Sequence, residues 1–148
     1  MTGYEIRRAQ PADAPAIAAC IDAAYAPILA QGLELPPVSE GVYDDIRDNT
    51  VWLAQGGDEV LGGLIVTCYD HVLHIANLFV NPAAQGRGLA RDLMRLANKH
   101  AQMQQCTEMR LATHKDMPEN VALYVHLGWE IYATERNKVM MSKPVSSR

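Results

Sequence analysis

Residues 77–91 constrain the fold most, because an apolar run there enters a glycine-rich turn that opens a long amphipathic pattern. The first turn of a helix leaves backbone N–H groups without intrahelical acceptors, and the helix dipole adds positive charge at that end. Gly86 and Gly88 lack a Cβ, so a phosphate can approach the backbone. Arg87 and Arg91 can add charge-assisted hydrogen bonds. The segment therefore predicts a site for a diphosphate-bearing ligand.

The glycine-rich turn has three other interpretations: a Rossmann fingerprint, a P-loop and a turn that binds nothing. A dinucleotide-binding Rossmann fingerprint needs glycine or alanine at position 91, where this chain has arginine, and a P-loop needs Gly-Lys-Ser/Thr after the turn. Neither pattern is present. Gly86 and Gly88 are, by themselves, equally compatible with a tight strand–helix connection that binds nothing.

The pattern of apolar residues predicts alternating strands and helices along the chain. We expect strands at residues 4–8, 51–54, 59–69, 71–80, 108–113, 129–133 and 138–142. We expect helices from residue 10 to a point before Gly32, and at residues 42–47, 86–104 and 118–127. This order favours an α/β (α+β) fold with helices on both faces of one sheet. We expect a single domain over residues 1–143 and a disordered tail at 144–148.

Composition narrows the classes of protein. The formal net charge is −4, with 13 Lys+Arg against 17 Asp+Glu, which argues against a nucleic-acid binder. There is no secretory signal and no apolar run near the roughly 20 residues of a membrane span, so we expect a cytoplasmic protein that does not bind membranes. The three cysteines, Cys20, Cys68 and Cys106, form no Cys-x-x-Cys pair. We expect them to be buried thiols in a reducing compartment and expect no metal site.

Two ordered motifs carry a family resemblance. Residues 85–90, Gln-Gly-Arg-Gly-Leu-Ala, fit Gln/Arg-x-x-Gly-x-Gly/Ala after a strand that ends in Val-Asn-Pro. About 35 residues later, residues 117–129 supply Asn, Ala, Leu-Tyr and Gly-aromatic positions in order. The pair resembles motifs A and B of the GCN5-related N-acetyltransferases, the GNAT family, and the likeness covers nearly the whole chain.

The resemblance implies a mixed, mostly antiparallel sheet whose fourth and fifth strands splay apart to hold acetyl-CoA. It places the pyrophosphate on the turn at residues 85–91. It pairs the pantetheine arm with the backbone of Leu78 and Val80 and takes the oxyanion donor from the backbone N–H groups of residues 78–79. It implies no metal. The implied cofactor-binding residues are Leu78, Phe79, Val80, Gln85, Gly86, Arg87, Gly88, Leu89, Ala90, Arg91 and Asn120.

By the same resemblance, Tyr124 is the catalytic acid that protonates the leaving thiolate, and Asn120 contacts the cofactor arm. Without the motif, Tyr124 reads as an aromatic residue packed at helical spacing with Leu123 and Leu127. The base stays open between strand residues, loop carboxylates and ordered water. The candidates considered are His74, Asn77, Asp70, Glu34 and Glu40. The loop at residues 32–45 is either an acidic rim that attracts a cationic amine or a solvated loop.

The predicted function is an N-acetyltransferase that moves an acetyl group from acetyl-CoA to a primary amine by direct attack in a ternary complex. The acceptor is a small-molecule amine or a protein amine, and the sequence does not choose between them. Homodimers are frequent in the family. One alternative is a non-catalytic acyl-CoA-binding regulatory module on the same fold, and another is a dinucleotide-binding redox domain.

Overall fold

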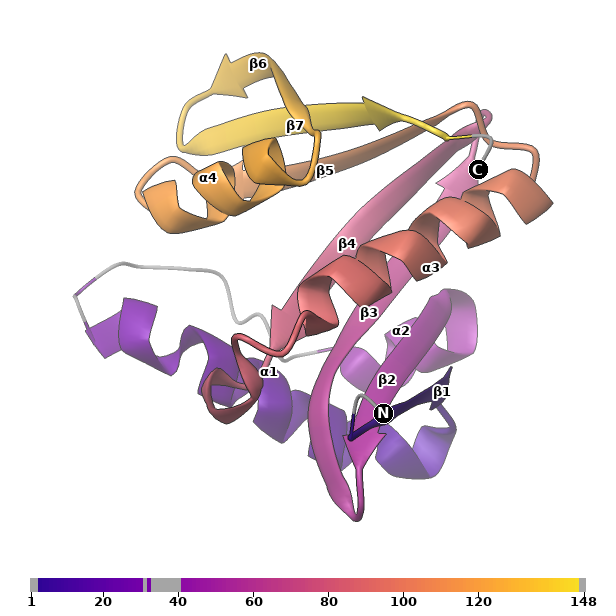
Figure 1. Ribbon diagram of the computed structural model, residues 1–148, viewed down its shortest axis with the longest axis vertical. Coiled ribbons are helices and arrows are strands. Elements are labelled where there is room, and N and C mark those ends of the chain that lie inside the picture. The colour runs from indigo at the N-terminus through magenta and orange to yellow at the C-terminus, as the bar shows by residue number, and fades with distance from the viewer. Residues whose placement is uncertain (1–2, 31, 33–40, 147–148) are drawn as a thin grey trace. The chain divides into compact units, whose positions relative to one another are not determined.

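The computed structural model describes residues 3–30, 32 and 41–146, which form a seven-stranded mixed sheet with helices (Figure 1). The strand order is β1-β2-β3-β4-β5-β7-β6. The strands are β1 (Glu5–Arg8), β2 (Thr50–Gly56), β3 (Glu59–Tyr69), β4 (Val72–Val80), β5 (Glu108–His114), β6 (Glu130–Glu135) and β7 (Lys138–Pro144). The helices are α1 (Ala14–Ala30), α2 (Val42–Asp48), α3 (Leu89–Met103) and α4 (Pro118–His126), with short 3-10 turns η1 (Pro11–Asp13) and η2 (Pro82–Ala84). The predicted fold class is confirmed.

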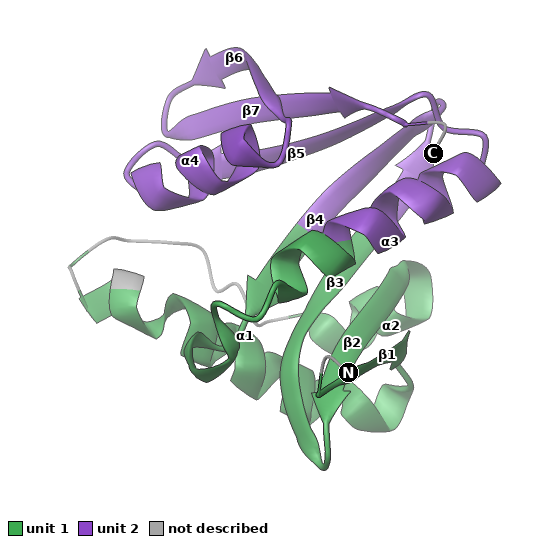
Figure 2. Ribbon diagram, in the orientation of Figure 1, with its two compact units in different colours: residues 1–66, 77–93 green, residues 67–76, 94–148 purple. Residues whose placement is uncertain are grey.

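The chain divides into two compact units (Figure 2). Unit 1 comprises residues 1–66 and 77–93, and unit 2 comprises residues 67–76 and 94–148. Among the described residues, no helix has both the length and the apolar character needed to cross a bilayer.

In unit 1, helices cover both faces of the sheet. Residues of α1 and α2 pack against one face of β2, β3 and β4. This core contains Ile17, Cys20, Ile21, Val42, Val51, Leu53, Ile65 and Phe79. On the opposite face, a Cβ added to Gly62 would lie 3.0 Å from Leu89 at the start of α3. A Cβ added to Gly63 would lie 2.4 Å from the Phe79 ring. These two glycines therefore let helix and ring approach the strand closely.

In unit 2, β7 lies between β5 and β6 and pairs with both in antiparallel orientation. Met109, Leu111, Val139 and Met141 are buried there. The parallel ladder between β4 and β5 has three pairs, from Val72 with Glu108 to His74 with Arg110. Beyond His74, the described residues of β4 form no pair with β5. This short ladder agrees with the expectation that the two central strands separate.

Two of the differences from the predicted boundaries bear on the site and on the end of the chain. Helix α3 begins at Leu89 and not at Gly86, because Gly86 and Gly88 have φ values of +84° and +79°, which a right-handed helix cannot contain. The expected disordered tail is wrong for residues 144–146. Pro144 ends β7, and the Val145 N–H donates to the Thr107 carbonyl at 3.0 Å. Ser146 exchanges hydrogen bonds with Asn98. Proline is tolerated at the last residue of a strand, where the ladder ends.

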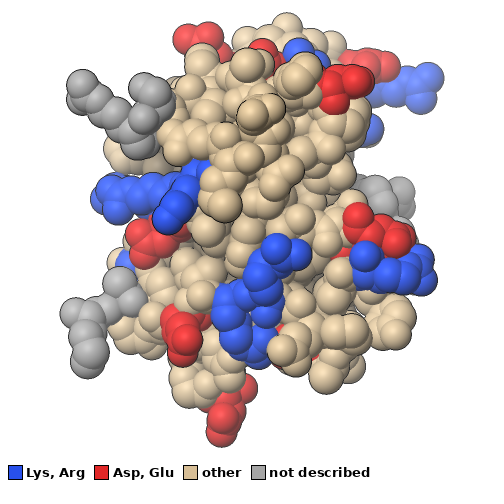
Figure 3. Space-filling model, turned by 90° about the vertical axis from the view of Figure 1, so that its right-hand side faces the viewer, with Lys and Arg blue, Asp and Glu red and all other residues tan. Residues whose placement is uncertain are grey.

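Charged side chains form local pairs on the surface. Arg7 contacts Asp13 at 2.9 Å, and Arg47 contacts Asp44 at 3.2 Å and Asp48 at 3.0 Å. Figure 3 shows basic and acidic side chains interspersed on the face it presents, without one continuous basic surface.

Candidate functional site

The turn between β4 and α3 is anchored firmly at its start. Asn81 follows the last residue of β4, and its N–H donates to the Leu61 carbonyl on β3 at 2.8 Å. The Asn81 side-chain Oδ1 accepts from the Ala83 N–H at 3.0 Å and so caps η2. Ala84 is buried beneath the turn. These contacts fix the backbone that leads into Gln85.

Gly86 and Gly88 then expose the backbone of the turn. A Cβ built on either residue would meet no atom within 4 Å among the described residues, so both positions face open space. The Gly88 carbonyl accepts the first α3 hydrogen bond, from the Asp92 N–H at 3.1 Å. The N–H groups of residues 89–91 come before this first donor, so the helix itself supplies no acceptor for them. This arrangement can hold an anion against backbone donors and the positive end of α3.

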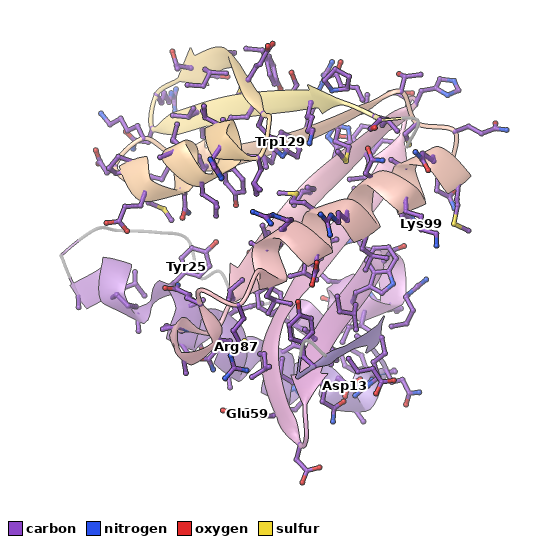
Figure 4. All side chains as sticks on the ribbon, viewed as in Figure 1. Asp13, Tyr25, Glu59, Arg87, Lys99 and Trp129 are labelled. Atoms are coloured by element: carbon purple, nitrogen blue, oxygen red, sulfur yellow. The ribbon has the colours of Figure 1, made fainter. Side chains whose placement is uncertain are left out.

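Some side chains of the turn are buried and others are exposed to solvent. Leu89 is 2% exposed and anchors the helix, so its contribution to a ligand is limited to its backbone. Ala90 is partly buried, whereas Gln85, Arg87 and Arg91 are exposed. Figure 4 labels Arg87 on this turn. The two arginines are thus available to a phosphate-bearing ligand near the start of α3.

The backbone of β4 offers a second feature of unit 1. The Asn81 N–H bonds to β3, and the Phe79 carbonyl oxygen points at Gly62, whose Cβ position lies 2.6 Å from it. Along a strand, alternate residues direct their N–H and C=O groups to the same neighbour. The groups of Leu78 and Val80 therefore point away from β3. The Phe79 side chain packs in the core of unit 1, so only its backbone is available to a cofactor, and its role in cofactor binding stays a prediction.

Tyr25 and Asn77 form a polar pair that the sequence analysis missed. The Tyr25 hydroxyl donates to Asn77 Oδ1 at 3.4 Å, from α1 to β4. Burial raises the pKa of Tyr25. Figure 4 labels Tyr25 where it projects from α1. The available signal was a tyrosine in an otherwise aliphatic helical stripe, because its hydroxyl needs a partner when buried.

Tyr124 and Asn120 lie together on α4 in unit 2. Tyr124 is 8% exposed, and its ring meets Trp129 edge to face with 6.3 Å between ring centroids. Leu123 is 38% exposed, so Tyr124 packs on Trp129 and not on that leucine. Asn120 is partly buried one helical turn before Tyr124. The turn and the β4 edge belong to unit 1, and the Tyr124 pair belongs to unit 2.

The candidate bases His74 and Asn77 have partners, Asp70 is exposed, and the other two lie outside the described residues. His74 stacks on Tyr69 with 4.1 Å between centroids, and burial, with help from the Arg110 charge, lowers the pKa of His74. Asn77 accepts from Tyr25. Asp70 is exposed at the β3–β4 turn. Glu34 and Glu40 lie outside the described residues.

Residues 41–45 of the acidic loop belong to α2 and the residue before it. Asp44 pairs with Arg47, and Asp45 accepts from the Asn49 amide at 2.9 Å. Tyr43 is 59% exposed. Within the described residues, no three His, Cys, Asp or Glu side chains gather as metal ligands.

Comparisons with known proteins agree with this geometry. A family model described as the acetyltransferase (GNAT) family matches residues 21–129. The structure is similar to that of PaiA N-acetyltransferase from Thermoplasma acidophilum in complex with coenzyme A, with TM-score 0.86, 16% identity, and 95% of this chain and 98% of that chain covered. It is similar to the ribosomal-protein-S18-alanine N-acetyltransferase from Escherichia coli, with TM-score 0.74, 17% identity, and 98% and 96% covered.

A third similar structure is a nourseothricin acetyltransferase, with TM-score 0.77, 22% identity, and 97% of this chain and 99% of that chain covered. At these identities the structural matches establish the fold, and the family model establishes the family over most of the chain. The chain belongs to the acetyltransferase (GNAT) family.

Proposed function

We propose that this protein transfers an acetyl group from acetyl-CoA to a primary amine by direct attack in a ternary complex. The observation that carries the proposal is the open backbone at Gly86 and Gly88, immediately before the free N–H groups of α3. A diphosphate can approach the backbone of such a turn, because even a Cβ at either glycine would meet no described atom within 4 Å. Coenzyme A carries a diphosphate, and the PaiA N-acetyltransferase structure contains coenzyme A.

The β4 edge extends this argument from the phosphates toward the acyl group. Leu78 and Val80 direct their peptide groups away from β3, and the ladder to β5 ends at His74. An extended amide-bearing arm can pair with such an edge as an added strand does. Leu78 and Phe79 are the two residues expected to donate an N–H to the oxyanion. The Phe79 peptide groups face β3, so the Leu78 N–H is the donor that points away from β3.

Acyl transfer also requires proton movements at both partners. A primary amine has a pKa of roughly 10.4, so it must lose a proton to become a nucleophile. We assign that proton to water, since the described histidine and amide candidates are held by stacking or hydrogen bonding. The leaving thiolate gains a proton or a hydrogen bond from Tyr124, whose position in the motif of residues 117–129 supports this role.

Tyr25 and Asn77 add polar groups to the side of β4 that faces α1. A hydroxyl and an amide there can orient an amine by hydrogen bonds without supplying net charge. The acceptor itself is open: the similar proteins include enzymes named for a ribosomal-protein alanine and for nourseothricin. The proposal therefore commits to a primary amine and to no particular molecule.

The experiment compares Tyr124→Phe with a matched control, Tyr132→Phe, in a steady-state acetyl-transfer assay. Tyr132 lies in the same unit and is 45% exposed, so its loss of a hydroxyl tests for unspecific effects. We expect Tyr124→Phe to lower kcat about 100-fold, as for a lost general acid, with acetyl-CoA affinity retained. The control should keep its kcat. An unchanged kcat in Tyr124→Phe excludes Tyr124 as the acid.

A further inference from the structure

A hydrogen bond between Tyr4 and Asp92 ties the start of β1 to the start of α3. The Tyr4 hydroxyl donates to Asp92 Oδ2, and both side chains are partly buried. Both residues belong to unit 1. They lie 88 positions apart in the sequence, so no local pattern predicts their contact. The bond brings a tyrosine from the edge of the sheet to the helix end that follows the glycine-rich turn.

The backbone on either side of Tyr4 is held by β2. Glu5 pairs with Gln55 in the antiparallel ladder between β1 and β2. On the other side, a Cβ added to Gly56 would lie 3.3 Å from the Gly3 carbonyl oxygen. Burial, with help from the hydrogen bond to Asp92, raises the pKa of Tyr4 to about 12. The hydroxyl therefore keeps its proton near neutral pH and stays a donor from a fixed position.

Asp92 brings a negative charge into the first turn of α3. Its N–H donates to the Gly88 carbonyl at 3.1 Å, so it lies one helical turn after the open glycine. Side chains of a helix lean toward its N-terminus. A carboxylate at this position, if it were not held, would bring its charge toward the N–H groups of residues 89–91. Those groups are the donors that a bound anion needs.

Helical spacing places the acid and the nearest arginine of the turn on different sides of α3. Leu89 and Leu93 are buried, and Asp92 comes three residues after Leu89, beside this buried stripe. Arg91 is exposed. The bond from Tyr4 therefore holds the carboxylate beside the stripe of α3 that packs inward, while the Arg91 guanidinium stays in solvent.

We propose that Tyr4 is a positioning residue that holds the Asp92 carboxylate toward β1 and away from the diphosphate of bound coenzyme A. This inference rests on the proposed function, because it assumes that the diphosphate lies on the glycine-rich turn. Tyr4 itself makes no contact with the ligand in this account. Its effect on affinity passes entirely through the charge of Asp92, which makes the role separable from simple anchoring of the helix.

The test is isothermal titration calorimetry with coenzyme A on the wild type, Tyr4→Phe, Asp92→Asn and the double variant, with thermal unfolding of the same samples. At low ionic strength, we expect Tyr4→Phe to raise the Kd roughly fivefold, as for a misplaced charge at a helix N-terminus. The difference should shrink at high salt, which screens charges. The double variant should recover the wild-type Kd, because asparagine carries no charge. Tyr132→Phe, a change at a 45% exposed tyrosine of unit 2, is the control and should bind as the wild type does.

Anchoring alone gives a different pattern. If Tyr4 only anchors α3, the double variant binds as weakly as Tyr4→Phe, and that result overturns the inference. An unchanged Kd in Tyr4→Phe overturns it as well. Asp92→Asn keeps an acceptor for the Tyr4 hydroxyl and should bind at least as tightly as the wild type, so weaker binding by this variant also contradicts the inference. In each of these cases the wild type still binds coenzyme A, whereas a wild type that does not bind it overturns the proposed function together with this inference.

Discussion

The substitution Gly88→Ala tests the turn without disturbing its neighbours. Gly88 has φ +79°, and a Cβ there meets nothing within 4 Å among the described residues. Gly57, in the β2–β3 hairpin of the same unit, has φ +62° and is equally open. Gly57→Ala is therefore a matched control, because it imposes the same kind of backbone strain away from the turn.

The two variants should lose similar stability but differ in their affinity for coenzyme A. A residue with a Cβ in the left-handed region costs about 1–2 kcal/mol, so both variants should lose similar stability. For a chain of this size, 1 kcal/mol lowers the Tm by roughly 2–4 °C. At Gly88 the new methyl group also occupies space that a phosphate needs. Losing one hydrogen bond to a charged group costs about 1.5–3 kcal/mol, which raises the Kd at least about tenfold.

The assay is isothermal titration calorimetry with coenzyme A, beside thermal unfolding of the same samples. We expect both variants to show the lower Tm and only Gly88→Ala to show the weaker binding. If Gly88→Ala binds coenzyme A as tightly as Gly57→Ala does, the turn does not hold the diphosphate. Equal losses of affinity in both variants would show that strain, and not the phosphate cradle, controls binding.

Three further predictions concern stability and pH. Gly63→Ala should destabilise the fold by about 3 kcal/mol in chemical denaturation, because the new Cβ would lie 2.4 Å from the Phe79 ring. Burial lowers the pKa of His74 from 6.5, so its contribution to stability is complete above pH 6.5 and declines as pH falls through the lower folded-state pKa. Urea titrations across that range should show the decline, and His74→Phe should flatten it. Removing residues 145–148 should cost about 1 kcal/mol in chemical denaturation, because the hydrogen bonds with Asn98 are lost.

Local patterns explain why much of the fold was predictable from sequence. The stripe of apolar residues in α3 has a helical period, and Leu89, Leu93, Ala97 and Ala101 are buried as that period requires. The glycine-rich turn was also predictable, since it depends on a strand, two glycines and a helix start that are adjacent in sequence. Gly128, with φ +97°, follows α4 where a left-handed residue ends a helix.

The features that escaped prediction depend on distant contacts. The Tyr25–Asn77 bond joins residues 52 positions apart. Pro144 lies in the segment that we expect to be a disordered tail, yet it pairs with Glu108 at the end of β7, a contact between residues far apart in sequence. Phe79 matched the family pattern by position, but only strand pairing showed the direction of its backbone groups.

The central claim is that this protein acetylates a primary amine. The most direct measurement incubates the wild-type chain with acetyl-CoA and a panel of small primary amines and amine-bearing peptides. It quantifies the free thiol of coenzyme A and the acetylated amine by mass spectrometry in the same samples. We predict that at least one amine is acetylated in proportion to the thiol released, and that Tyr124→Phe sharply reduces both products. Tight binding of acetyl-CoA without an acetylated product from any amine in the panel would contradict the claim and favour a non-catalytic acyl-CoA-binding module.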